Sequence, residues 1–183
     1  MRVLTYLRQK YLIINNNAFY WDSENRIVHK IDKINSIPLD LLLGIDSQKD
    51  KLLKNTKNFA VGNFTNNALL WGSRGNGKST LVKSIFNKLY NENKNLKIIQ
   101  INKEDILEIN KIFSIINEYF KFRFILFIDD LSFEKLDNNY KLTKSLLDGN
   151  IQNQPKNSIL YVTSNRRHLM PRDMIDNERS SAI

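Results

Sequence analysis

A glycine-rich octapeptide at residues 72–79 carries the clearest chemistry in the sequence. It reads Gly-Ser-Arg-Gly-Asn-Gly-Lys-Ser and fits the pattern G-x-x-x-x-G-K-[ST]. A polyphosphate needs several backbone N–H groups directed at it, and glycines allow a loop to curl tightly enough to provide them. Lys78 is expected to reach the β- and γ-phosphates of a nucleotide, and the Ser79 hydroxyl is expected to bind Mg²⁺.

The context of this octapeptide also fits a phosphate-binding loop. The run ALLW before it predicts a strand, and KSTLVKSIFNKLY after it predicts a helix whose N-terminal dipole would face the same anion. A chance turn rich in glycine and serine is the alternative interpretation. The residues predicted here to bind the nucleotide are Gly72, Ser73, Arg74, Gly75, Asn76, Gly77, Lys78, Ser79 and Thr80.

Two adjacent aspartates follow the apolar run 124–128. A carboxylate after such a strand lies at the carboxyl edge of an α/β sheet, where these sheets bind ligands. Asp129 is expected to hold Mg²⁺, directly or through water, and Asp130 to polarise the attacking water. Capping of a helix is the alternative, although one aspartate would be enough for it. Glu134 is a second candidate for the water-polarising role.

A polar residue, Asn165, ends another strand-like run at residues 159–163. If that strand lies beside the strand before the phosphate loop, Asn165 would stand between the aspartates and the γ-phosphate and hold the attacking water. A simple turn asparagine is the alternative. Arg166, Arg167 and His168 follow, and they would either stabilise transition-state charge, lie on the surface, or contact a neighbouring subunit.

The elements that must position these residues alternate between strand and helix. Strands are predicted at Ala68–Trp71, Leu96–Ile101, Phe124–Ile128 and Ser158–Thr163, and helices at about 46–59, 78–90, 103–119 and 139–147. Residues 1–40 give weaker signals, a candidate helix near 2–13 and a strand near 25–30. Alternation with nearly continuous apolar strands predicts the α/β class. The expected fold is a P-loop NTPase, a three-layer αβα arrangement around a parallel sheet.

Composition sets limits on the class of protein. The chain has 183 residues and no cysteine, which excludes disulfides and thiolate metal sites. It has no apolar stretch of roughly 18 residues and no signal-peptide pattern at its start, so we expect no membrane span and a cytoplasmic location. A net charge of +9 would suit a nucleic-acid partner, but heavy use of Lys, Asn and Ile throughout is also what an AT-rich coding sequence produces.

Four segments resemble a bacterial family of predicted AAA+ ATPases, catalogued as a domain of unknown function, number eight-fifteen. They are Leu41–Phe59, Asn66–Ser84, Arg123–Glu134 and Ser164–Pro171. The resemblance covers about residues 40–178. It implies a sheet with strand order 5-1-4-3-2 followed by a helical lid, and it implies that Ile45 packs against the adenine base.

The same resemblance suggests a division of the chain into an N-terminal extension at 1–40 and an AAA+ core at 41–183. This core is expected to be incomplete at its C-terminus. The residues after Asn165 are too few for a fifth strand, a lid with its sensor arginine and an arginine-finger segment. Without the fifth strand, the strand before the phosphate loop would be a sheet edge.

Together these features predict an AAA+ type ATPase with ATP and Mg²⁺ as cofactors. Hydrolysis would be coupled to remodelling of a protein or nucleic-acid partner. Assembly of the chain into a homo-oligomer is a further option that the sequence leaves undecided. The alternative is a nucleotide-binding module with negligible hydrolysis. A small-molecule kinase fits less well, because the paired aspartates and Asn165 suit activation of water rather than of a substrate hydroxyl.

Overall fold

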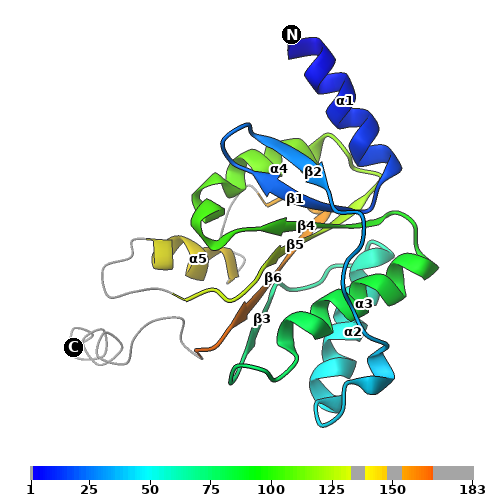
Figure 1. The fold of residues 1–183 in the computed structure, drawn as a ribbon, viewed down its shortest axis with the longest axis vertical. Coiled ribbons are helices and arrows are strands. Elements are labelled where there is room, and N and C mark those ends of the chain that lie inside the picture. The colour runs from blue at the N-terminus through cyan, green and yellow to red at the C-terminus, as the bar shows by residue number, and fades with distance from the viewer. Residues whose placement is uncertain (1, 133–138, 148–153, 167–183) are drawn as a thin grey trace.

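The fold is built around one sheet (Figure 1), and the computed structural model describes residues 2–132, 139–147 and 154–166. The strands are β1 (Ala18–Asp22), β2 (Ile27–Lys30), β3 (Ala68–Trp71), β4 (Leu96–Ile101), β5 (Arg123–Ile128) and β6 (Ser158–Ser164). The α-helices are α1 (Arg2–Asn15), α2 (Asp46–Ala60), α3 (Lys78–Glu92), α4 (Ile109–Asn117) and α5 (Asn139–Leu147). Two 3₁₀ segments, η1 (Leu39–Leu41) and η2 (Lys103–Glu108), complete the described elements.

The sheet has the order β2-β1-β4-β5-β6-β3. Strands β4, β5, β6 and β3 are parallel neighbours, as the predicted order 1-4-3-2 requires. In this order β6 lies between β5 and β3, so the carboxyl ends of all three strands meet at one edge. Among the described residues β3 pairs only with β6, which makes it an edge strand.

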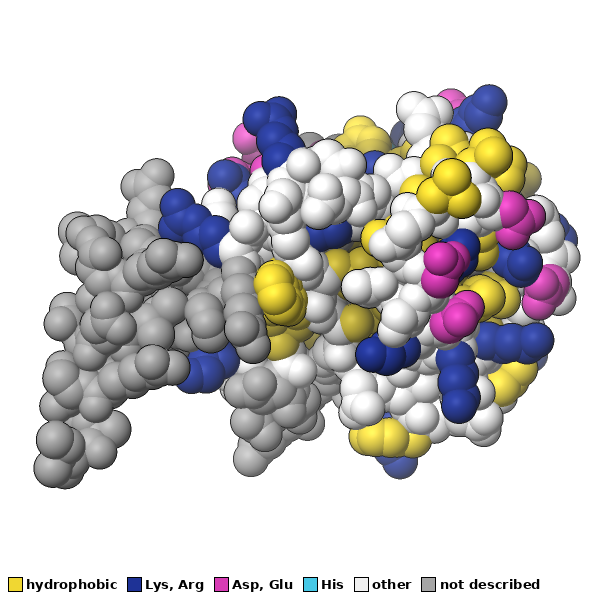
Figure 2. Space-filling model, turned by 90° about the horizontal axis from the view of Figure 1, so that it is seen from below, with side chains coloured by type: hydrophobic (Ala, Val, Ile, Leu, Met, Phe, Trp, Pro, Cys, Tyr) yellow, Lys and Arg dark blue, Asp and Glu magenta, His cyan; other side chains and the backbone are white. Residues whose placement is uncertain are grey.

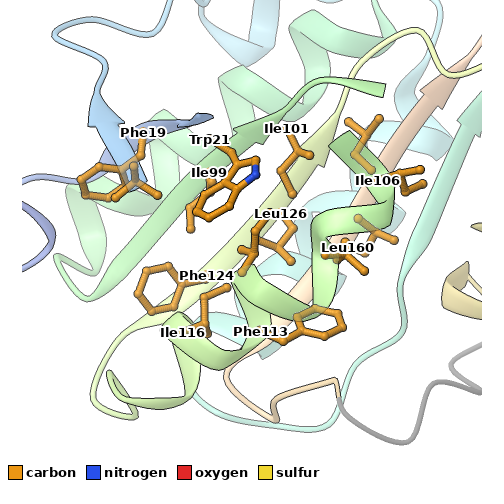
Figure 3. Close-up of a cluster of buried hydrophobic side chains, with 14 of the residues drawn as sticks. Phe19, Trp21, Ile99, Ile101, Ile106, Phe113, Ile116, Phe124, Leu126 and Leu160 are labelled. Atoms are coloured by element: carbon orange, nitrogen blue, oxygen red, sulfur yellow. The ribbon is translucent and has the colours of Figure 1, made fainter. Parts of the chain in front are cut away.

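Helices cover both faces of the sheet and form the predicted three layers. On one face α2 and α3 pack through Leu52, Phe59 and Ile85 against strand residues such as Phe127. On the other face α4 packs through Ile112 and its neighbours, and α5 adds a buried leucine. Figure 3 shows this second cluster, with Phe113 and Ile116 lying against Phe124 and Leu126 of β5. Alternate residues of β5 therefore serve opposite cores, which explains its continuous apolar sequence.

The N-terminal residues extend this sheet. Strand β1 joins β4 in parallel, and β2 pairs with β1 in antiparallel register. The predicted strand near residues 25–30 corresponds to β2, whereas β1 was not predicted from the sequence. The burial of Ala18, Phe19 and Trp21 follows no helical period and only part of a strand alternation, so the segment AFYWD gives little periodic signal.

The helix predicted over residues 103–119 is shorter than expected. Its first part is the 3₁₀ segment η2, and α4 begins only at Ile109. Ile106 of η2 and Ile109, which directly follows η2, are both buried. Their spacing of three residues suits a 3₁₀ turn, in which side chains at i and i+3 lie on one face.

The surface carries its charge in a dispersed form. Figure 2 shows Lys and Arg side chains spread over one face of the molecule, with acidic side chains between some of them. Within the ranges that the structure describes, no helix has the length and apolar character needed to cross a membrane.

Candidate nucleotide site

The predicted phosphate loop connects β3 to α3 in a conformation that depends on its glycines. The helix begins at Lys78, directly after Gly77. Gly75 has φ +83° and Gly77 has φ +72°, a left-handed backbone that side-chain-bearing residues rarely adopt. A Cβ atom at Gly77 would also lie 3.4 Å from Cδ2 of Leu42. The loop can therefore turn tightly into the N-terminus of α3, where unpaired N–H groups and the helix dipole favour an anion.

The Lys78 side chain joins this loop to the end of β6. Its Nζ atom donates to the carbonyl oxygens of Gly72 and Ser73, at 2.8 Å each, and to Oδ1 of Asn165 at 3.1 Å. The first two bonds close the loop around the ammonium group. The third brings Asn165, 87 positions away in the chain, to the same point.

Ser79 and Asp129 are in direct contact across the sheet edge. The Ser79 hydroxyl donates to Oδ1 of Asp129, which follows β5 directly. The Thr163 hydroxyl donates to the same oxygen at 2.5 Å. The structure thus places the serine and the carboxylate that were predicted to bind Mg²⁺ side by side, although they are 50 positions apart.

Asp130 adopts an unusual backbone conformation, with φ +52°. Aspartate tolerates this left-handed region better than most residues, and such outliers concentrate at functional sites. Two contacts hold it: its N–H donates to the Thr163 hydroxyl oxygen at 2.9 Å, and Asn165 Nδ2 donates to its Oδ1 at 2.6 Å. The side chain is exposed, so water can reach it.

Hydrogen bonds therefore link residues from three predicted motifs into one network. The members that were predicted are Lys78 and Ser79 from the loop, Asp129 and Asp130 after β5, and Asn165 after β6. Serine and aspartate oxygens are hard ligands of the kind Mg²⁺ prefers. Among the described residues no group of three or more His, Cys, Asp or Glu side chains could hold a metal ion.

The other predicted site residues surround this network or lie outside the described residues. Ser73, Arg74 and Asn76 are exposed in the loop, and Thr80 is half-buried on α3. Ile45 is half-buried next to a cavity of about 630 Å³ that runs along the free edge of β3, and Asn76 and Lys78 also line it. Glu134, Arg167 and His168 lie outside the described residues, whereas Arg166 is described and exposed.

One residue of the network, Thr163, was not predicted from the sequence. It is buried in β6, opposite Leu70 of the strand that leads into the loop. Its single hydroxyl hydrogen goes to Asp129 and its oxygen accepts from Asp130, so it positions both aspartates. The available signal was a hydroxyl near the end of this strand, two positions before Asn165.

Comparison with protein families supports the predicted relationship. The model described as "Protein of unknown function (DUF815)" matches residues 14–183. The chain belongs to this family. The DUF815 match includes β1 and β2 as well as the whole candidate site. A search of curated proteins finds no match.

Solved structures with the same fold are distant in sequence. Caenorhabditis elegans PCH-2 is 16% identical with a TM-score of 0.51, and the match covers 77% of this chain and 42% of that one. A chain of the Escherichia coli HORMA:CdnC:Trip13 complex is 12% identical, also with a TM-score of 0.51, with 85% and 69% covered. Thermotoga maritima RuvB is 22% identical with a TM-score of 0.48, with 76% and 44% covered.

These likenesses establish the AAA+ P-loop NTPase fold for this DUF815 chain. The chain spans less than half the length of the RuvB and PCH-2 chains that it matches. Their activities are therefore properties of larger proteins.

Proposed function

We propose that this chain binds ATP together with Mg²⁺ and hydrolyses it, as an AAA+ type ATPase. The observation that carries the proposal is the contact between Ser79 and Asp129. A phosphate loop alone would suit many anions. A loop serine that meets a carboxylate at the carboxyl ends of β3 and β5 suits a nucleotide with its metal ion.

Each residue of the network has a role in this proposal. The backbone N–H groups of residues 72–79 and the Lys78 ammonium group bind the β- and γ-phosphates. Ser79 and Asp129 hold Mg²⁺, which when bound neutralises phosphate charge. Ile45 contacts the base from the cavity beside β3.

Asp130 and Asn165 are proposed to position the attacking water. Their side chains are hydrogen-bonded to each other at 2.6 Å and Asn165 also contacts Lys78, so a water bound beside this pair would face the terminal phosphate. Arg166 is a candidate source of positive charge, and so is an arginine from another subunit. Glu134 stays a second candidate for the role of Asp130. Energy from hydrolysis would then act on a protein or nucleic-acid partner.

Binding of a fluorescent ATP analogue tests the loop assignment. We expect Lys78→Ala to weaken binding at least about a hundredfold, because it removes the charge that meets the phosphates. Lys88→Ala is the matched control, since Lys88 is exposed on the same helix but lies far from the loop in sequence. Equal affinities in the two variants would reject the phosphate-loop assignment.

A nucleotide-binding module without significant turnover is a second candidate. It is favoured by the side chain at position 130, because aspartate reaches less far towards water than glutamate does. Phosphate release by the wild type and by Asp130→Asn separates the two functions. An ATPase requires a measurable wild-type rate that falls in the variant, whereas equally low rates in both proteins would indicate binding alone.

The basic composition leaves nucleic acid as a proposed partner. If phosphate contacts bind it, retention of DNA by the chain should weaken steeply as ionic strength rises. No retention of DNA even at low ionic strength would argue against nucleic acid as the partner.

A further inference from the structure

Helix α1 presents an apolar stripe to solvent. The stripe consists of Leu4, Leu7, Tyr11 and Ile14, whose exposed fractions are 74%, 54%, 72% and 46%. These residues are spaced by three, four and three positions, which is the a/d spacing of a helix that packs against another helix. In Figure 1 the helix projects from the rest of the molecule at the N-terminus.

The opposite side of α1 is fixed to the body of the protein. The Gln9 side chain donates to the Val28 carbonyl at 3.1 Å and accepts from the Val28 N–H at 2.9 Å. Ile13 is buried, and the Tyr6 hydroxyl donates to Glu118 at 3.2 Å. At the end of the helix, Lys97 Nζ donates to the Asn16 carbonyl at 2.5 Å. These contacts set the rotation of α1 and turn the stripe away from the core.

Two basic residues flank the stripe. If Leu4 and Leu7 take positions a and d, Arg8 and Lys10 take positions e and g, which face a partner helix from either side. Both side chains are exposed, and the sequence of α1 contains no acidic residue. Within the described ranges neither residue forms an ion pair.

This charge pattern disfavours pairing of α1 with its own copy. In an antiparallel pair Arg8 would face Arg8 and Lys10 would face Lys10, because e meets e and g meets g. In a parallel pair Lys10 would face Asn15, which offers no opposite charge. A helix with Glu or Asp at the facing positions would gain attraction at both basic residues.

We propose that α1 is a docking surface for an amphipathic helix of a partner protein, with acidic residues on both sides of its apolar seam. Two heptads bury little area, so the contact belongs with small, transient interfaces. The DUF815 match begins at residue 14, near the end of α1. Because α1 is fixed to β2, at the opposite end of the sheet from β3, the docking surface is separate from the nucleotide site and goes beyond the proposed ATPase function.

A pair of labelled peptides tests the proposal with the full chain. Both probes are three-heptad helices with Ile and Leu at a and d, and they differ only in carrying Glu or Lys at e and g. Fluorescence anisotropy should show binding of the Glu peptide and none of the Lys peptide. The change Leu7→Asp should weaken binding by about tenfold or more. The double change Arg8→Glu, Lys10→Glu should transfer binding to the Lys peptide.

A matched variant controls for general effects of a new charge. Leu107 is 60% exposed and lies in η2, outside α1, so Leu107→Asp should bind the Glu peptide like the wild type. Leu7 is more than half exposed, and circular dichroism should show that Leu7→Asp stays folded. Lys78→Ala should leave peptide binding intact, and Leu7→Asp should leave ATP binding intact, so the two proposals fail separately.

Three results would overturn the docking surface. The first is equal binding, or no binding, of the two peptides. The second is a concentration-dependent dimer in sedimentation that Leu7→Asp abolishes, since it would make a second copy the occupant. The third is binding to phosphatidylserine vesicles that Leu7→Asp abolishes, with no peptide binding, since it would make the occupant a membrane.

Discussion

Replacement of Thr163 by valine should loosen both aspartates of the site while preserving the shape of the buried side chain. The hydroxyl donates to Asp129 at 2.5 Å and accepts from the Asp130 N–H at 2.9 Å, and the residue is 1% exposed. A hydrogen bond to a charged group contributes roughly 1.5–3 kcal/mol and a neutral one roughly 0.5–1.5 kcal/mol. We therefore expect Thr163→Val to lower the free energy of unfolding by about 2–4.5 kcal/mol.

Urea unfolding followed by circular dichroism measures this loss. Thr163→Ser is the control, because it keeps the hydroxyl and should lose only the smaller contribution of one methyl group, about 1 kcal/mol. The valine variant should unfold at a lower urea concentration than the serine variant, with a similar dependence on urea. If valine is as stable as the wild type, the hydroxyl does not hold the two aspartates and the positioning role of Thr163 is refuted.

Two further predictions concern buried polar groups outside the site. Burial lowers the pKa of Lys97 to about 8 from its ordinary 10.5, so between these values the unfolded chain holds a proton that the folded chain has lost. Stability should consequently rise with pH in that window, by at most roughly 3 kcal/mol, and urea titrations between pH 8 and 10 should show no such rise in Lys97→Met. Tyr161, whose pKa burial raises to about 12, contacts the Thr56 hydroxyl at 2.8 Å and Asn55 at 3.1 Å. Tyr161→Phe should lower the free energy of unfolding, measured in urea, by about 1–3 kcal/mol. Tyr20→Phe, at an exposed position, is the control and should lower it only slightly. Equal unfolding midpoints for the two variants would contradict this prediction.

The central sheet could be predicted from the sequence because its strands are buried on both faces. Phe124–Ile128 is apolar throughout, and the helices that follow such strands have clear amphipathic spacing. The order of β3, β6, β5 and β4 came from the family resemblance, and the structure confirms it. Local periodicity carries no information about which strands become neighbours.

The N-terminal strands and the network around the aspartates were harder to predict. Strand β1 is five residues long and lacks a regular alternation, and its place beside β4 depends on contacts between distant residues. The role of Thr163 depends on the register of β6 against β5, in which Ile128 pairs with Val162 and Asp129 therefore lies next to Thr163. Its residue type offers a hydroxyl but does not say which side chains the hydroxyl contacts.

The most direct test of the account is the dependence of ATP affinity on Mg²⁺ in the wild type and in Asp129→Ala. If Ser79 and Asp129 hold the metal beside the phosphate loop, Mg²⁺ should strengthen nucleotide binding by the wild type. The variant should bind nucleotide in EDTA but gain little or nothing from added Mg²⁺. An equal gain in the two proteins would contradict the site described for Asp129.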